Sequence, residues 1–127
     1  MKLFTKAQYE KLLQNGSNRD KDHPPVIKLF TPDAQCTWLI SEIDPSDPDT
    51  AFGLCDLGFG EPELGYVHLP EILRLRGKLG LPVERDYSFT GEYPLSVYAH
   101  AARKSGAITK NPATLRQAAE ALARKAV

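Results

Sequence analysis

The chain has 127 residues, of which 42% are hydrophobic and 25% are charged, a composition typical of one globular domain with its own core. No apolar run approaches the roughly 20 residues that a membrane-spanning helix needs, and no signal-peptide core follows the first residues. The two cysteines, Cys36 and Cys55, are too few for a disulfide framework, so we expect a cytoplasmic protein.

The formal net charge of zero hides an uneven distribution of charge along the chain. Residues 1–99 carry 10 basic and 15 acidic side chains, whereas residues 100–127 carry six basic side chains and one acidic side chain. Within the first part, residues 29–73 hold nine acidic side chains and no Lys or Arg. Such a separation bears on solubility and on partners rather than on the fold, and two differently solvated faces are its simplest interpretation.

The first predicted element is a helix over residues 5–16. Thr5 and Gln8 have the spacing of a capping box, and Phe4 and Tyr9 have the spacing of a hydrophobic staple. A polar loop follows this helix, and a pair of prolines then favours extended backbone.

Alternating apolar and polar residues predict a β-meander at the centre of the fold. We expect strands at residues 26–30, 37–44, 52–58 and 64–69, with the turn 45–49 joining the second strand to the third. A simple register for this hairpin pairs Asp44 with Phe52, Glu42 with Leu54, and Trp38 with Gly58. One face is then a clean core candidate, made by Leu39, Ile43, Cys55 and Leu57. The other face mixes apolar groups with carboxylates: Trp38, Ile40, Glu42, Asp44, Phe52, Leu54 and Asp56.

The second half of the chain reads as helices with extended segments between them. Pro70 begins a helix to about Arg76, residues 81–83 and 87–89 add an edge to the sheet, and Pro94 begins a helix that Gly106 ends. A last helix starts at Asn111-Pro112 with a thin apolar stripe made by Leu115, Ala118, Ala119, Leu122 and Ala126. We therefore predict an α+β fold in one domain, 1–127, with a mostly antiparallel sheet of four or five strands and helices packed on one face.

Several motifs in the central region belong together. They are Trp38, Glu42 and Asp44, then Phe52-Gly53-Leu54, Gly58-Phe59, Glu61-Pro62-Glu63-Leu64-Gly65-Tyr66 and Leu81-Pro82-Val83-Glu84-Arg85-Asp86. This set resembles a bacterial family called "domain of unknown function 2958" over about residues 26–96, which leaves residues 100–127 as a basic C-terminal helical extension. The resemblance implies a small cytoplasmic protein carried on plasmids, phages and integrated elements. It implies no activity, catalytic residue or cofactor.

The spacing of the cysteine, histidine and carboxylate residues does not indicate a metal site or a catalytic site. Cys36, Cys55 and the three histidines form no C-x-x-C or H-x-x-x-H pair. The expected register separates the two thiols by about five residues, roughly 16 Å, so we expect free thiols and no metal site. Motifs for a nucleophile or a phosphate cradle are also missing, so we assign no catalytic residue and no cofactor. One enzymatic alternative is a metal-dependent hydrolase using Glu42, Asp44, Asp56, Glu61 and Glu63.

The acidic meander favours a non-enzymatic interaction or modulator protein that binds a basic protein partner. A concentrated negative field attracts positive surfaces, and aromatic residues among the acids, Phe52 and Phe59 included, are suited to anchor an interface. The predicted partner-binding residues are Trp38, Glu42, Asp44, Asp56, Glu61, Glu63 and Tyr66. With the mobile-element setting of the family, one possible target is a host DNA-binding or defence enzyme.

A further alternative is a nucleic-acid-associated accessory protein. The acidic stretch would repel phosphates, so nucleic acid would have to bind the C-terminal segment. The residues that would contact phosphates are Arg103, Lys104, Lys110, Arg116, Arg124 and Lys125.

Overall fold

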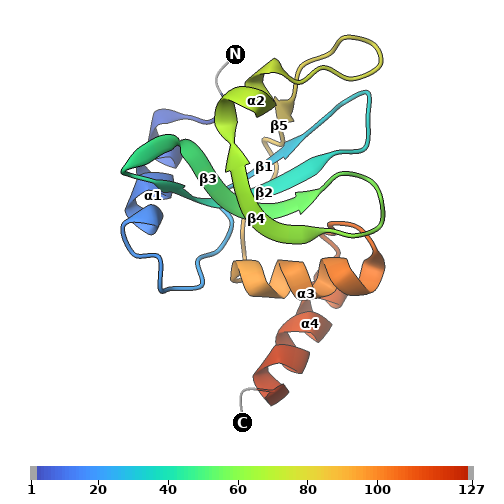
Figure 1. The fold of residues 1–127 in the computed structure, drawn as a ribbon. Helices are drawn as coiled ribbons and strands as arrows, with labels where there is room; N and C mark the ends of the chain where they lie inside the picture. Colours follow the sequence, from blue (N-terminus) through green and yellow to red (C-terminus); the bar gives the residue numbers. More distant parts are fainter. Residues whose placement is uncertain (1–2, 126–127) are drawn as a thin grey trace.

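The computed structural model describes residues 3–125, which form a five-stranded antiparallel sheet and four helices (Figure 1). In chain order the elements are α1 (Lys6–Gly16), β1 (Ile27–Phe30), β2 (Thr37–Asp44), β3 (Asp47–Asp56), β4 (Glu63–His68), α2 (Leu69–Arg74), β5 (Glu84–Arg85), α3 (Leu95–Ser105) and α4 (Pro112–Lys125). The strand order is β4-β3-β2-β1-β5, and every neighbouring pair is antiparallel. The predicted α+β class and the antiparallel meander are confirmed.

Local sequence signals determine how α1 begins. The Gln8 amide donates to Thr5 Oγ1 at 3.1 Å and the Thr5 amide donates to Gln8 Oε1 at 2.8 Å, which completes the predicted capping box. The rings of Phe4 and Tyr9 stack with centroids 5.6 Å apart, as the staple spacing predicts. At the other end, a Cβ on Gly16 would lie 1.8 Å from the carbonyl oxygen of Ile43, so the close packing of α1 on β2 requires glycine there.

The predicted register of the β2–β3 hairpin is wrong. Asp44 pairs with Asp47, so the strands are joined by Pro45 and Ser46 alone, and β3 begins five residues earlier than expected. Glu42 pairs with Phe52 instead of Leu54, and Trp38 pairs with Cys55 instead of Gly58. The offset changes along the strands because the register shifts between Ile40 and Glu42 and again between Ile43 and Asp44.

Ser41 is the extra residue at the first of these shifts. Its carbonyl oxygen accepts a hydrogen bond from Asn15 Nδ2 at 2.9 Å, and its hydroxyl donates to the carbonyl oxygen of Phe52 at 3.3 Å. Asn15 and Ser41 are both buried, so α1 supplies a polar partner where the bulge interrupts the ladder. The bulge reverses the alternation of side chains, which puts Ile43 on the same face as Trp38 and Ile40.

Both faces of the sheet are covered by helices, which differs from the expected one-sided packing. One core cluster joins Trp38, Ile40 and Ile43 to Leu12 of α1 and to Leu69 and Ile72 of α2. The other joins Leu39 and Leu54 to the apolar faces of α3 and α4. Figure 1 shows α3 crossing beneath the sheet. Because each face of β2 and β3 carries apolar side chains, neither face could be left to solvent.

The elements after β4 follow the sequence signals closely. Helix α2 ends at Arg74, slightly before the expected Arg76, and the edge strand β5 lies between the two predicted extended segments. Gly106, with φ of 78°, ends α3, and Asn111 Oδ1 accepts the Thr114 amide at 3.0 Å at the start of α4. Leu115 and Ala118 are buried against α3, whereas Ala126 of the predicted stripe lies outside the described residues.

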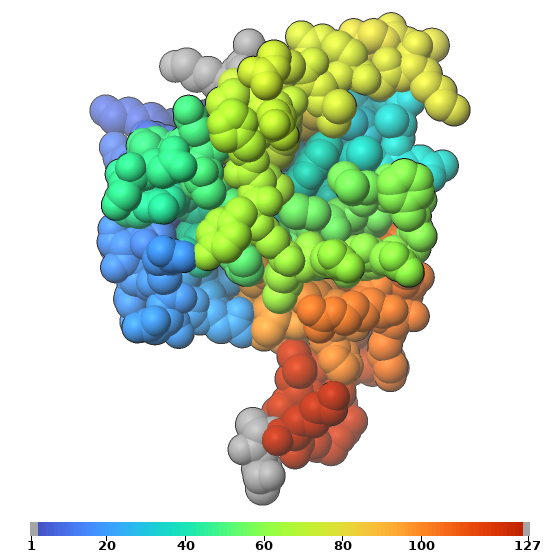
Figure 2. Space-filling model, viewed as in Figure 1, coloured from blue at the N-terminus to red at the C-terminus, as the bar shows by residue number. Residues whose placement is uncertain are grey.

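Helix α4 projects below the rest of the molecule (Figure 2).

No helix between residues 3 and 125 has the length and apolar composition needed to cross a membrane.

Candidate protein-binding surface

The seven residues predicted to bind a partner are divided between the core and the surface. Trp38 is only 5% exposed and packs in the cluster beneath α1 and α2. Asp56 is also 5% exposed. Neither side chain offers contact area to a partner in this structure, so their assignment to the binding surface is corrected. The expected one-sided packing of helices is the cause for Trp38, because α1 and α2 cover the face that was expected to be only partly covered.

Asp56 holds two segments of the protein together. One carboxylate oxygen accepts the Gly58 amide at 2.9 Å, and the other accepts the Ile108 amide at 3.0 Å. The first hydrogen bond orders the β3–β4 loop, and the second attaches the connection between α3 and α4 to the sheet. The carboxylate is therefore occupied by backbone donors of its own chain.

Asp44 has a comparable local role. Its Oδ1 atom accepts the Ser46 amide at 2.8 Å within the tight turn between β2 and β3. Asp44 is partly buried, and the exposed acidic residues at this end of the sheet are its neighbours Asp47 and Asp49.

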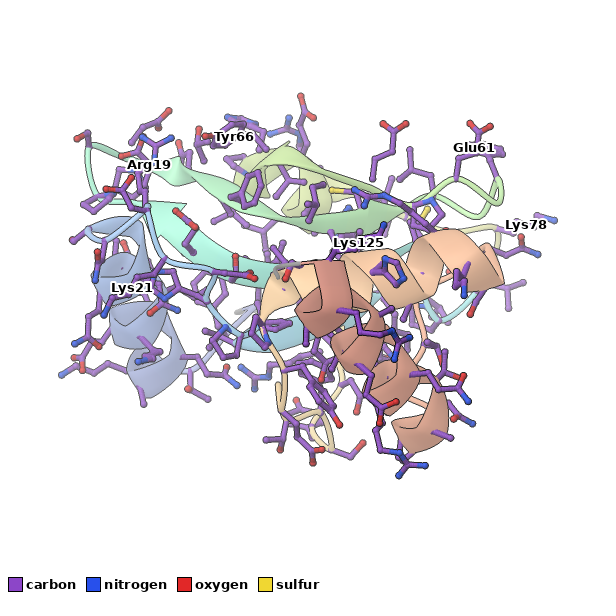
Figure 3. All side chains as sticks on the ribbon, turned by 90° about the horizontal axis from the view of Figure 1, so that it is seen from below. Arg19, Lys21, Glu61, Tyr66, Lys78 and Lys125 are labelled. Carbon is purple, nitrogen blue, oxygen red and sulfur yellow. The ribbon has the colours of Figure 1, made fainter. Side chains whose placement is uncertain are left out.

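Three of the four remaining predicted residues lie on an exposed strip along β4 and the loop before it, whereas Glu42 lies on β2 and is partly buried. Glu61, Glu63 and Tyr66 are exposed, and Tyr66 is 62% exposed. Phe59 at the tip of the loop is 84% exposed, and two leucines on this strip are exposed as well. We call this strip the β4 surface and define it by Leu57, Phe59, Glu61, Glu63, Leu64 and Tyr66. Figure 3 shows Glu61 and Tyr66 at opposite ends of it.

The loop presents Phe59 in a defined conformation. Gly58 and Gly60 on either side have φ of 88° and 83°, a region that other residues rarely adopt. Since Asp56 also anchors the Gly58 amide, the aromatic ring is displayed on an anchored turn. A rigidly displayed aromatic side chain loses little conformational freedom when it is buried by a partner.

β4 is an edge strand of the sheet, paired with β3 and with no strand beyond it among the described residues (Figure 1). In an antiparallel strand, alternate residues direct their backbone amide and carbonyl groups away from the paired neighbour. Those groups are able to pair with an extended segment of another chain. Leu64 and Tyr66 pair with Leu54 and Phe52, so they lie on the face that α3 covers.

Glu42 and Tyr66 line a hollow of about 430 Å³ together with Arg19, Asp20 and Phe52. Arg19 Nη2 donates to the Tyr66 hydroxyl at 2.6 Å, and its Cζ atom lies 6.0 Å from the centre of the ring. Figure 3 shows these two side chains next to each other. Burial raises the pKa of Glu42, and the nearby positive charges of His23 and Arg19 only partly oppose this shift.

The basic residues named for nucleic-acid binding are spread over three segments. Arg103 and Lys104 lie in the last turn of α3, and Arg116, Arg124 and Lys125 are exposed on α4. Lys110 instead forms an ion pair with Asp86 at 2.9 Å, and Lys28 reaches the same carboxylate at 3.4 Å. Hydrogen bonds from Lys110 and Ser88 hold the pKa of Asp86 well below its usual range. Lys110 therefore has a structural role.

Within residues 3–125, no three His, Cys, Asp or Glu side chains are placed to share a metal ion, so the five carboxylates of the hydrolase alternative do not form such a group. Cys36 and Cys55 are free thiols. Cys55 pairs with Trp38, so it lies two positions from Cys36 along the strands, closer than the expected five. Burial raises the pKa of Cys55 to about 11.

The profile of a family described as "Protein of unknown function (DUF2958)" matches residues 3–109. No curated protein and no solved structure matches the chain. The matched range contains the whole sheet, the β4 surface and α3, and it ends before α4.

Proposed function

The chain belongs to the DUF2958 family, as its motifs predicted, and we propose that it is a non-enzymatic module that binds a basic protein partner through the β4 surface. One observation carries this proposal: exposed apolar and aromatic side chains lie next to carboxylates along an edge strand and the loop that precedes it. Aromatic anchors supply most of the binding energy at protein interfaces, and flanking charges select the partner.

The size of the anchors supports a specific interface. Burying a fully exposed Phe or Leu side chain contributes about 1.5–3 kcal/mol. Phe59, which is 84% exposed, could contribute in this range, whereas Leu64 is 38% exposed and would contribute less; pairing along the β4 backbone would add hydrogen bonds. A patch of this kind on a single domain is a recognised sign of an interaction site.

The charge of the surface points to a partner rich in Lys or Arg. Residues 29–73 contain no Lys or Arg, so the strands of the β4 surface supply no lysine or arginine as a counter-charge. Proteins that bind DNA carry concentrated positive charge to contact phosphates. Our proposal therefore includes a DNA-binding or defence enzyme of the host as the target, in the mobile-element setting that the family resemblance implies. It also places the protein in the cytoplasm, since both thiols are free.

Quantitative affinity capture from bacterial lysate tests the proposal. The wild-type chain is compared with Phe59→Ser and with Glu61→Lys/Glu63→Lys. Tyr87→Ser is the matched aromatic control, because Tyr87 is equally exposed but lies beyond β5 at the other edge of the sheet. The captured protein is then purified, and its affinity for each variant is measured.

We expect both β4 variants to bind the purified partner about tenfold or more weakly, which corresponds to about 1.4 kcal/mol, and Tyr87→Ser to bind like the wild type. Unchanged binding by both β4 variants, or failure of the wild type to capture any protein, contradicts the proposal.

A second candidate function rests on α4. This helix projects from the body (Figure 2) and carries exposed Arg116, Arg124 and Lys125. Contacts from such a helix to phosphates would give salt-dependent retention on DNA. Substituting these three residues with Glu leaves Leu115 and Ala118 in place to pack on α3, and it should abolish retention if α4 binds nucleic acid.

A further inference from the structure

We propose that the hollow beside Tyr66 accepts an arginine side chain of the partner, and that Arg19 occupies part of this position in the free protein. We call it the Tyr66 hollow, and its lining consists of Arg19, Asp20, Glu42, Phe52 and Tyr66. The inference rests on the proposed function, because Tyr66 belongs both to the hollow and to the β4 surface. The inference specifies which chemical group of the partner, an arginine guanidinium, binds at this position.

The lining has the chemistry that recognises a guanidinium group. Glu42 and Asp20 provide carboxylates, and Tyr66 and Phe52 provide aromatic rings, whose centroids lie 5.1 Å apart in an edge-to-face arrangement. A guanidinium is planar, stacks on aromatic rings and pairs with a carboxylate through two parallel hydrogen bonds, whereas an ammonium does neither as well. The volume of about 430 Å³ also leaves room for backbone next to the side chain.

Glu42 is the acceptor that the free protein leaves unpaired. The ion pairs among the described residues both involve Asp86, and no hydrogen bond to the Glu42 carboxylate is formed by residues 3–125. Burial raises the pKa of Glu42, although the charges of His23 and Arg19 oppose this shift. A charged donor delivered by a partner would give this carboxylate a hydrogen-bonded ion pair.

Arg19 indicates how a cation sits here. Its guanidinium donates to the Tyr66 hydroxyl, its Cζ atom lies 6.0 Å from the ring centroid, and its charge reaches Glu42. It lies in the exposed loop between α1 and β1, which makes it easily displaced. A partner arginine that pairs directly with Glu42 would therefore replace Arg19.

The position of the hollow fits the proposed interface. Tyr66 lies on β4 opposite Phe52 of β3, and Phe52 in turn pairs with Glu42 of β2. A segment lying along β4 could thus extend one side chain over Tyr66 toward Glu42. The arginine would be an anchor at one end of the β4 surface, with Phe59 at the other.

The test uses the full chain labelled with ¹⁵N and titrated with N-acetyl-arginine amide in low-salt buffer, following amide chemical shifts. Glu42→Gln removes the carboxylate charge without changing its shape, and Glu120→Gln on α4 is the matched control. Arg19→Ala removes the internal cation, and Arg116→Ala on α4 is its control. The amide spectrum of each variant also reports whether it is folded.

We expect shifts centred on Phe52 and Tyr66, affinity about fivefold weaker in Glu42→Gln, and affinity about threefold tighter in Arg19→Ala, with both controls within about twofold of the wild type. Equal binding by Glu42→Gln, or no tightening in Arg19→Ala, overturns the inference.

The two proposals fail separately. If capture of the partner depends on Phe59 but arginine binding is insensitive to Glu42, the Tyr66 hollow is refuted and the proposed function stands. If arginine binding depends on Glu42 but no partner depends on the β4 surface, the hollow stands as a cation site and the proposed function is refuted.

Discussion

Asp56 gives the sharpest test of the structure, because its carboxylate was expected to bind a partner and instead accepts two backbone amides. Asp56→Ala leaves the Gly58 and Ile108 amides without these acceptors in a site where the side chain is almost fully buried. A hydrogen bond to a charged group contributes about 1.5–3 kcal/mol, so the loss of two should lower the free energy of unfolding by about 3–6 kcal/mol. Asp56→Asn retains one carbonyl oxygen and should lose about half as much.

Urea unfolding followed by tryptophan fluorescence measures this effect directly, because Trp38 is the one tryptophan of the chain and is buried in the core. Glu61→Gln is the control, since a substitution of an exposed residue changes stability by no more than about 0.5 kcal/mol. The structural role of Asp56 is refuted if Asp56→Ala unfolds at the same urea concentration as this control, with the same slope. If Asp56→Ala is destabilised as expected, a defect of this variant in binding a partner would reflect a disordered β3–β4 loop.

Three more predictions concern titrating groups. Because burial raises the pKa of Glu42 above 4.5, the free energy of unfolding should fall as pH rises through the raised value. Urea unfolding should therefore show that Glu42→Gln is more stable than the wild type at pH 7, with a difference that vanishes toward pH 4. Because the pKa of Asp86 is held below 3.8, the stability that its ionised form contributes is present above that pH and is lost as pH falls. Asp86→Asn should lower the free energy of unfolding by about 1–2 kcal/mol at pH 7, because it breaks the bond to Lys110. Equal stability of the two proteins at pH 7 would contradict this. With a pKa of about 11, Cys55 should stay unmodified by iodoacetamide at pH 8 in the native protein and react in urea, whereas rapid native labelling detected by mass spectrometry would show that the thiol is not buried.

The helix ends could be predicted because their signals are local. The capping box of α1, the staple of Phe4 on Tyr9 and the cap of α4 by Asn111 each join residues three to five positions apart. Gly106 similarly ends α3 through its own backbone conformation. These interactions form within one turn of chain, so they depend little on the rest of the fold.

The hairpin register could not be read from the alternation of residues. It depends on the bulge at Ser41, and that bulge is stabilised by Asn15, which is 26 positions earlier in the chain. Alternation within β2 and β3 is compatible with more than one pairing, and a shift changes which side chains are covered. Trp38 is buried for a separate reason, because helices cover both faces of the sheet.

The Tyr66 hollow was only half predictable. Glu42 and Tyr66 were predicted to bind a partner because of their charge and aromatic area. Arg19 and Asp20 come from a segment whose sequence predicts only a polar, solvent-exposed loop. Arg19 and Tyr66 are 47 positions apart, and the packing of α1 on β2 places the loop of Arg19 next to Tyr66 of β4. No local pattern carries information about such a contact.

The structure also changes what the acidic composition means for binding. Asp44 and Asp56 direct their carboxylates to backbone amides of their own chain, and Asp33 accepts the amides of Leu79 and Leu81. These carboxylates still count toward the net charge, but their oxygens already accept hydrogen bonds, so fewer of the nine are free to pair with groups of a partner.

A surface with fewer free charges must select its partner by shape and apolar contact as well as by sign. Binding through Phe59, Leu64 and the β4 backbone is insensitive to salt, whereas the contributions of Glu61 and Glu63 are screened within about 10 Å at 0.1 M salt. We therefore expect binding of the partner to weaken with salt much less steeply than that partner's binding to DNA, where every neutralised phosphate releases a counterion. Equal salt slopes for the two complexes would show that charge alone drives the association, and the exposed aromatic residues would then need another explanation.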